Sequence, residues 1–450
     1  MELPNYFIAD LPREHAVTPK LVFEACQTLK RNREQYLLGR STSSIVGVLD
    51  AVAQGWLENG NPFCKLALER GVAETGFGET TIARGLEAFF KELTADNLNS
   101  LLAQDLGHVE RLDRFMTDRI TSTAALARGP GLLVHIAAGN IPNPTILSIV
   151  FGFLLRSAQF VKCARGTSLL PRLFAHSIYE VEPKLASCLE IAEWPGGAEP
   201  LEQPLFSEAD CVVATGSDET LAAVRRRLPM HARFLGYGHR VSFGYISSDA
   251  ISRYELKKTV ENAARDVVAW NQLGCLSPHV FYVEHGGAIS AEQFAGKLAE
   301  QLAEYESTEP RGELPAEEAA VIASKRGVYE VRAAASAGTK LWKSEDSTAW
   351  TVVYEVDPQF RVSCLNRFIY VKPVAALSDA LRHAENVRGK VSTVGLATSG
   401  EKTQQLATEL AHWGVTRICR LGQMQNPPLT WRHDGRPALG DLVTWTDWET

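Results

Sequence analysis

The feature that most constrains the fold is a series of short apolar segments that alternate with helical patterns from residue 131 onward. These segments cover residues 132–136, 160–163, 189–192 and 211–214. Short apolar strands that alternate with helices are typical of βαβ units, whose strands form a parallel sheet buried on both faces. The sequence therefore predicts a parallel α/β sheet, and such sheets bind ligands at the turns that follow their strands.

The rest of the chain adds a helical region before this sheet and a second α/β unit after it. Residues 15 to about 125 carry apolar side chains at the spacing of amphipathic helices. The second unit begins with a strand pattern at residue 241, and a helix is predicted over residues 255–270. Its further strands are predicted over residues 279–284, 350–356, 367–372, 390–397 and 416–421. The C-terminal tail holds three tryptophans (Trp431, Trp445 and Trp448), so we expect it to pack against protein.

Composition excludes several classes of protein. The 450 residues carry a net charge of −7 and a pI of about 5.9, so no global basic field is present to attract nucleic acid. The longest apolar stretch, residues 146–155, is too short for a membrane span, and the N-terminus lacks the pattern of a secretory signal. Eight cysteines are scattered without a CxxC pair, which argues against a zinc site or a disulfide framework. We therefore expect a cytoplasmic protein without a metal site.

Cys275 is the strongest candidate for chemistry. It lies in residues 271–278, with the sequence NQLGCLSP, between a predicted helix and a predicted strand. Gly274 and Pro278 bracket a tight turn, which can present a thiol at a cleft. A thiolate accepts an acyl group well because it is nucleophilic and is also a good leaving group. An unreactive cysteine packed in a loop is the alternative interpretation of the same pattern.

Three junctions between a predicted strand and a predicted helix carry further candidates. The Asn140 amide can donate a hydrogen bond to an oxyanion, although asparagine is also a favoured helix N-cap. The turn Thr215-Gly216-Ser217 can direct backbone N–H groups at a phosphate. Lys162 and Arg165 follow another strand, and these two cations either hold a ribose phosphate or face solvent.

In their order along the chain, these motifs resemble the aldehyde dehydrogenase superfamily. The motifs are Gly139-Asn140-Ile141-Pro142, Phe160-Val161-Lys162, Ala214-Thr215-Gly216-Ser217, Leu235-Gly236-Tyr237-Gly238 and Cys275. Within that superfamily the chain resembles the LuxC-type acyl-CoA reductases, the fatty-acid reductases known from bacterial bioluminescence. Residues 134–142 look like that family's own version of the asparagine motif. The ending His433-Asp434-Gly435-Arg436-Pro437 also resembles that family. The resemblance covers about residues 40–450.

The resemblance implies an aldehyde-dehydrogenase-like α/β fold with a Rossmann-like cofactor domain and an α/β catalytic domain. We place the helical N-terminal region and the NADP-binding domain in residues 1–237, the catalytic domain in residues 238–422, and a tryptophan-rich tail in residues 423–450. Members of the superfamily assemble through a strand or hairpin arm, so a homo-oligomer is expected. The tail is a candidate for that interface, and packing on its own chain is the alternative.

The resemblance also implies roles for individual residues. Cys275 is the nucleophile, and the Asn140 side chain forms the oxyanion hole together with the Cys275 backbone N–H. Lys162 binds the adenosine ribose region, and Thr215-Gly216-Ser217 lies beside the cofactor pyrophosphate and nicotinamide. Gly236 belongs to the same cofactor-binding set. Because Lys162 and Arg165 are both cations, NADPH is favoured over NADH.

Two positions depart from the oxidising members of the superfamily. In those members a glutamate that activates water stands just before the Leu-Gly segment. Here Phe234 precedes Leu235-Gly236. Without that base the thioacyl-enzyme persists until hydride or a thiol resolves it, which favours acyl reduction over aldehyde oxidation. Residues 365–368 also lack the glutamate that contacts the nicotinamide ribose in relatives. The base that deprotonates Cys275 stays open among His135, His239 and His279.

The predicted reaction is therefore the NADPH-dependent reduction of an acyl thioester to the aldehyde through a thioacyl-cysteine. The acyl donor is an acyl-CoA, an acyl carrier, or a partner acyl-activating or acyl-transfer protein, and a long fatty chain is implied by the resemblance alone. Three alternatives stay open. They are a reductase of an acyl phosphate, an aldehyde oxidoreductase that forms the acid, and a non-catalytic subunit that scaffolds a partner acyl-transfer enzyme.

Overall fold

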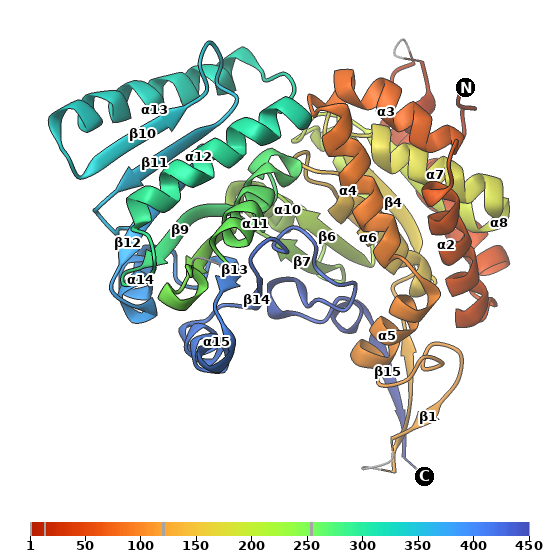
Figure 1. Cartoon of the computed structure of the whole chain (residues 1–450). Helices are drawn as coiled ribbons and strands as arrows, with labels where there is room; N and C mark the ends of the chain where they lie inside the picture. Colours follow the sequence, from red (N-terminus) through yellow and green to blue (C-terminus); the bar gives the residue numbers. More distant parts are fainter. Residues whose placement is uncertain (1, 13–14, 119–121, 253–254, 450) are drawn as a thin grey trace.

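The computed structural model describes residues 2–12, 15–118, 122–252 and 255–449, and it contains two large sheets and one small sheet (Figure 1). Residues before 238 supply the first large sheet, and residues from 241 onward supply the second. Helices cover both faces of each large sheet, so each sheet lies between two apolar layers. This arrangement is the predicted α/β fold.

The first sheet has five parallel strands in the order β5-β4-β3-β6-β7. The strands are β3 (Leu132–Ile136), β4 (Ala158–Cys163), β5 (Leu189–Glu193), β6 (Cys211–Thr215) and β7 (Arg233–Tyr237). The chain places β4 and β5 on one side of β3 and then returns to place β6 and β7 on the other side. Strand order therefore reverses between β3 and β6, and open α/β sheets bind ligands in the crevice at the carboxyl ends of such strands.

Helices from the N-terminal region pack on this sheet together with the crossover helices. On one face α2 (Thr42–Leu57) packs with α6 (Asn143–Leu154) and α7 (Leu169–Val181), and on the other α1 (Pro19–Asn32) packs with α9 (Glu199–Glu208). The remaining helices of this part are α3 (Pro62–Thr75), α4 (Glu79–Glu92), α5 (Ala95–Leu106), α8 (Pro183–Ala186) and α10 (Asp218–Arg227). The starts of four N-terminal helices are fixed by N-cap side chains that accept a backbone hydrogen bond, from Thr18, Ser41, Asn61 and Thr94.

The second sheet has seven strands in the order β10-β11-β12-β9-β8-β13-β14, and only the pairing of β10 with β11 is antiparallel. The strands are β8 (Val241–Ile246), β9 (Pro278–Glu284), β10 (Thr339–Lys343), β11 (Thr351–Glu355), β12 (Phe368–Val374), β13 (Val391–Ala397) and β14 (Arg417–Arg420). The helices are α11 (Leu256–Val268), α12 (Ala291–Thr308), α13 (Ala316–Ala335), α14 (Leu377–His383) and α15 (Thr403–Trp413). β8 and β9 are buried along almost their full length. The loop that leads directly into β9 is therefore rigidly anchored at this end.

The small sheet is an arm that projects from the molecule (Figure 1). It contains β1 (Met116–Thr117), β2 (Ala124–Arg128) and β15 (Thr444–Trp448), with β2 in the middle and both pairings antiparallel. The prediction of helix up to about residue 125 is therefore wrong beyond Leu106, because β2 is stabilised by a strand from the distant C-terminal segment. All five residues of β15 are exposed. Among the helices of the described part of the chain, none has both the length and the apolar character for crossing a membrane.

Candidate active site

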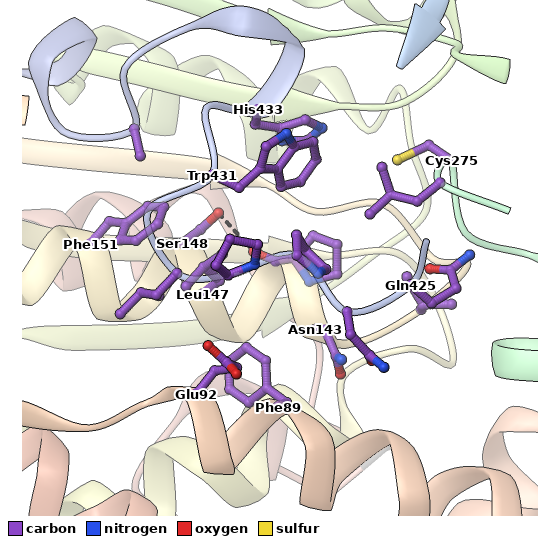
Figure 2. A pocket seen from close by; sticks show the side chains of 18 of the residues that line it. Phe89, Glu92, Asn143, Leu147, Ser148, Phe151, Cys275, Gln425, Trp431 and His433 are labelled. Atoms are coloured by element: carbon purple, nitrogen blue, oxygen red, sulfur yellow. Dashed lines mark hydrogen bonds between the residues drawn. The ribbon is translucent and has the colours of Figure 1, made fainter. Parts of the chain in front are cut away.

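A cavity of about 350 Å³ lies where the two large sheets, helices α4 and α6, and the C-terminal segment come together (Figure 2). Cys275 lines this cavity, and so does Thr215 at the carboxyl end of β6. The walls are largely apolar and include Phe89, Leu93, Ile141, Leu147, Phe151, Leu276, Pro427, Pro428, Leu429 and Leu442. A thiol beside an apolar chamber of this kind can act on a substrate with an apolar tail.

The loop that carries Cys275 is held from three directions. The Ser242 hydroxyl donates to the Cys275 carbonyl (2.8 Å), which ties the loop to β8. The Ser277 N–H donates to the Gly274 carbonyl (2.9 Å) and closes the predicted tight turn. The Gln425 amide donates to the Ser277 hydroxyl, and a Cβ at position 274 would lie 2.7 Å from that amide. A side chain at position 274 would displace the Gln425 amide, so Gly274 allows this contact, which helps to fix the location of the thiol.

Just before this loop, three consecutive residues have a left-handed backbone. Trp270, Asn271 and Gln272 have φ values of 49°, 51° and 65°, a conformation that costs a non-glycine residue about 1–2 kcal/mol. Side chains of the same residues offset this cost. Asn271 Nδ2 donates to the Arg311 carbonyl (2.7 Å), and Gln272 Nε2 donates to the carbonyls of Pro278 (2.7 Å) and Phe368 (3.0 Å).

A second left-handed triplet supports the first. Leu365, Asn366 and Arg367 have φ values of 65°, 55° and 65°. The fully buried Arg367 donates from Nε to Asn271 Oδ1 (3.1 Å) and from Nη1 to Glu306 (3.0 Å). The segment in which relatives carry a ribose-binding glutamate thus holds an arginine that braces the Cys275 loop from behind.

The Cys275 thiol lies in an environment that keeps it protonated. Burial raises the pKa of Cys275 to about 12, and the nearby Asp434 carboxylate adds to this increase. Arg240 and Arg417 act in the opposite direction but do not offset the burial. Because the thiolate is the reactive form, the site requires a proton acceptor close to Cys275.

The structure separates two asparagines that the sequence brings close together. Asn140 is exposed and does not line the cavity, whereas Asn143, the first residue of α6, does line it (Figure 2). The Asn143 Oδ1 atom is buried without a hydrogen-bond partner among the described residues. That oxygen is an acceptor, while Nδ2 makes no hydrogen bond within the described residues and can donate to a polar group of a ligand in the cavity. The sequence offers one signal for it, an asparagine directly before Pro144 at a helix start.

The residues expected to bind a cofactor lie at the carboxyl edge of the first sheet, but in different surroundings. Lys162 in β4 is only 4% exposed, and its ammonium has no hydrogen-bond or ion-pair partner within the described ranges. Burial lowers its pKa. Arg165 is exposed in the turn after β4, and Glu193 at the end of β5 accepts hydrogen bonds from the Gly166 N–H (2.8 Å) and the Ser168 hydroxyl (2.6 Å).

The other expected cofactor residues have local structural roles. Thr215 ends β6, and the Gly216 N–H donates to the Tyr237 carbonyl (3.2 Å). Ser217 is the N-cap of α10, and its exposed hydroxyl accepts the Thr220 N–H (3.2 Å). Gly236 lies in β7, where a Cβ would meet the Phe234 ring at 2.9 Å. Phe234 thus packs within the sheet. It stands at the position where the sequence lacks the water-activating glutamate of the oxidising members.

The three histidines considered from the sequence differ in their surroundings. His135 lines the cavity, and its Nε2 hydrogen-bonds with Gln159 (3.0 Å), while burial lowers its pKa to about 4. His279 Nδ1 accepts the Ser363 N–H (3.0 Å), and burial also lowers the pKa of His279 to about 4. His239 is exposed. A fourth histidine, His433, lines the cavity and was not among the expected candidates.

Comparison with known proteins agrees with this architecture. Residues 38–445 match the family described as acyl-CoA reductase (LuxC). The chain is 23% identical over 358 residues to the long-chain acyl-protein thioester reductase of Aliivibrio fischeri, which covers 78% of this chain and 70% of that protein. It is 23% identical over 356 residues to the corresponding reductase of Vibrio harveyi, covering 78% of this chain and 71% of that protein.

Solved structures share the fold. A NAD-dependent benzaldehyde dehydrogenase from Corynebacterium glutamicum superposes with a TM-score of 0.72 at 12% identity, over 96% of this chain and 91% of that one. A salicylaldehyde dehydrogenase from Pseudomonas putida G7 gives a TM-score of 0.71 at 14% identity, with coverage of 96% and 91%. The predicted aldehyde-dehydrogenase-like fold is therefore confirmed.

Proposed function

This chain belongs to the acyl-CoA reductase (LuxC) family, and we propose that it reduces an acyl thioester to an aldehyde through a thioacyl intermediate on Cys275. The observation that carries the proposal is the position of this thiol at an apolar cavity that the Asn143 side chain also lines. Phe234 supports reduction over hydrolysis, since it supplies no carboxylate to activate water. Glu92 is in the cavity lining, but it lies on α4, across the cavity from Cys275 in Figure 2.

In the first step, the Cys275 sulfur attacks the thioester carbonyl and the donor thiol leaves. The tetrahedral oxyanion accepts hydrogen bonds from the Asn143 amide and the Cys275 backbone N–H. One such donor is typically worth roughly 3 kcal/mol in the transition state. We assign this role to Asn143 in place of Asn140, because only Asn143 lines the cavity that Cys275 lines. The apolar walls hold the acyl chain.

The carboxyl edge of the first sheet fits a nicotinamide nucleotide. Lys162 is largely buried and its ammonium makes no hydrogen bond or ion pair within the described ranges, which suits a ribose or phosphate oxygen, and Thr215 brings the same edge to the cavity. When bound, the reduced nucleotide supplies hydride to the acyl carbon, and the product leaves Cys275 as the aldehyde. Glu193 accepts two hydrogen bonds from the segment after β4, and the cations Lys162 and Arg165 are the groups that favour the additional phosphate of NADPH.

The acyl donor is proposed to be an acyl-CoA, an acyl carrier or a partner acyl-transfer protein, and the exposed arm is proposed to join copies of this chain. The test follows NADPH absorbance with purified protein and acyl-CoAs of increasing chain length, alongside Cys275→Ala. We expect acyl-dependent oxidation of NADPH with aldehyde formation, and none in the variant. Turnover of acyl phosphate but not of thioester would contradict the proposal. An adduct on Cys275 formed only from a partner protein would identify that protein as the donor.

A further inference from the structure

We propose that His433 is the general base and general acid of Cys275 acylation. This inference rests on the proposed function and deepens it, because it names the group that takes the proton from the thiol. His433 and Cys275 line the same cavity, and Figure 2 shows the sulfur of Cys275 pointing into it on the side where Trp431 and His433 lie. His433 therefore faces the space in which the acyl group is transferred.

The His433 ring is fixed by an aromatic stack. Its ring lies parallel to Tyr237 (centroid distance 4.5 Å, interplanar angle 12°) and is tilted against Trp431 (4.7 Å, 36°). The Arg436 guanidinium lies 5.4 Å from the Tyr237 centroid, and that of Arg417 lies 5.6 Å from the Trp431 centroid. These two ring contacts restrict rotation of the imidazole, and its nitrogen atoms lie on the ring edge, where they can interact with a ligand.

A tight turn directs this ring inward. Asp434 and Gly435 follow with φ values of 53° and 77°, and a Cβ at Gly435 would lie 3.2 Å from Thr416. The Arg436 N–H donates to the His433 carbonyl (3.1 Å) and closes the turn. The Asp434 carboxylate accepts a hydrogen bond from Arg240 Nε (2.9 Å), so the turn is anchored to the segment before β8.

The nitrogen atoms of His433 make no hydrogen bond to any residue in the described part of the chain. His135 also lines the cavity, but its Nε2 is occupied by Gln159, and its unpaired Nδ1 is fully buried. Burial lowers the pKa of His433, and Arg240 and Arg436 lower it further while Asp434 raises it. The ring is therefore neutral at pH 7 and able to accept a proton. An imidazolium formed there would lie close to the Asp434 carboxylate.

The charged and titratable groups around this ring are Tyr237, Arg240, Cys275, Arg417, Asp434, Arg436 and Asp441. Arg240 and Asp434 influence both His433 and Cys275, so the two groups share one electrostatic environment. Removal of the proton from Cys275 to His433 turns a neutral pair into an ion pair. The acyl-transfer step then does not require spontaneous ionisation of Cys275, whose pKa is raised to about 12.

The proposed step is balanced without a cofactor. The Cys275 proton moves to the imidazole as the sulfur forms a bond to the acyl carbonyl carbon. The bond between that carbon and the donor sulfur then breaks, and the imidazolium returns the proton to the departing thiolate. The products are the acylated Cys275, the donor thiol and neutral His433. No oxidant or reductant takes part.

The test measures acylation of Cys275 from an acyl-CoA by intact-protein mass spectrometry, without nucleotide, between pH 6 and 9. For the wild type we expect a rate that changes little from pH 7 to 9. In His433→Asn we expect a rate about 100-fold lower at pH 7. The rate of this variant should rise about tenfold per pH unit, because it depends on spontaneous ionisation of the thiol. His433→Phe, which retains an aromatic ring in the stack, should behave in the same way, and His239→Gln should match the wild type.

Partial recovery of the rate in His433→Ala by added imidazole would support proton transfer rather than a packing role. A wild-type rate and pH profile in both His433→Asn and His433→Phe would overturn the proposal. The same holds if the pH-independent region is lost in His135→Asn and retained in the His433 variants. Failure of the wild type to form an adduct on Cys275 from any of the proposed acyl donors, acyl-CoA, acyl carrier or acylated partner protein, would overturn the proposed function itself, so the two failures are distinguishable.

Discussion

The two large sheets are both built mainly from parallel strands between layers of helices, but the groups to which we assign a function lie at opposite ends of the strands. In the first sheet, Lys162 and Thr215 lie near the carboxyl ends of β4 and β6. In the second, Cys275 precedes the amino end of β9. The first position follows from the topology of the sheet, which opens a crevice where strand order reverses. The second has no such origin, and it depends on two strained segments that hold each other in place.

The largest expected effect tests this dependence. Arg367→Met removes the buried guanidinium that bonds to Asn271 and Glu306. Loss of one partner from a buried polar network typically costs about 3–5 kcal/mol, and we expect about 3 kcal/mol here because Glu306 is partly exposed. Urea unfolding would measure the loss. Arg382→Met removes an exposed ion pair and should change stability by less than about 0.5 kcal/mol. Similar values for both variants would show that the left-handed segments are stable without this brace.

The next prediction compares the two asparagines. Asn143→Ala should lower the rate of Cys275 acylation by roughly 100-fold or more, because it removes a donor to the oxyanion. Asn140→Ala should change that rate by less than a few-fold, since Asn140 is exposed and outside the cavity. Stopped-flow release of the donor thiol would measure both. A large loss in Asn140→Ala alone would restore the assignment made from the sequence.

A third prediction separates the proposed role of the first sheet in NADPH binding from that of the second sheet in acylation. Lys162→Met should raise the KM for NADPH about tenfold, which corresponds to about 1.4 kcal/mol. Acylation of Cys275 in the absence of nucleotide should stay at the wild-type rate. Steady-state kinetics with NADPH and NADH would check the first part, and mass spectrometry the second. Arg165→Met should reduce the preference for NADPH over NADH. An unchanged preference in the variant that combines Lys162→Met with Arg165→Met would contradict the assignment to NADPH.

The last prediction concerns pH. Asp266 in α11 accepts hydrogen bonds from the Gly422 and Met424 N–H groups, yet burial raises its pKa to about 7. The folded state therefore binds this proton more tightly than the unfolded state, so the contribution of Asp266 to stability is greatest at low pH. It is lost as pH rises toward 7. Relative to Asp266→Asn, the wild type should lose stability between pH 4 and 7 in urea unfolding. If the free energy of unfolding depends on pH in the same way for both proteins, this linkage is excluded.

The sequence was most informative where local pattern decides structure. All four apolar segments predicted for the first sheet are strands, and the fold class follows from them. Cys275, the proposed nucleophile, was singled out by its turn, whereas the supports of that turn were not predicted. No propensity indicates that Arg367 would reach Asn271, 96 residues away. The helical pattern before residue 125 failed for the same reason, because β2 depends on β15. His433 was missed because only the folded chain brings its turn to the cavity.

The pairing of β2 with β15 has a consequence for the order in which the protein is made. The Thr444 hydroxyl donates to the carbonyl of Arg128, 316 residues away, across these two strands. At typical synthesis rates that separation corresponds to roughly 15 to 60 seconds on the ribosome. During that interval β2 has an open edge, and the cavity lacks the wall that residues 423–442 supply. The nascent chain thus acquires an enclosed substrate chamber and a finished arm almost simultaneously, after both large sheets have been synthesised.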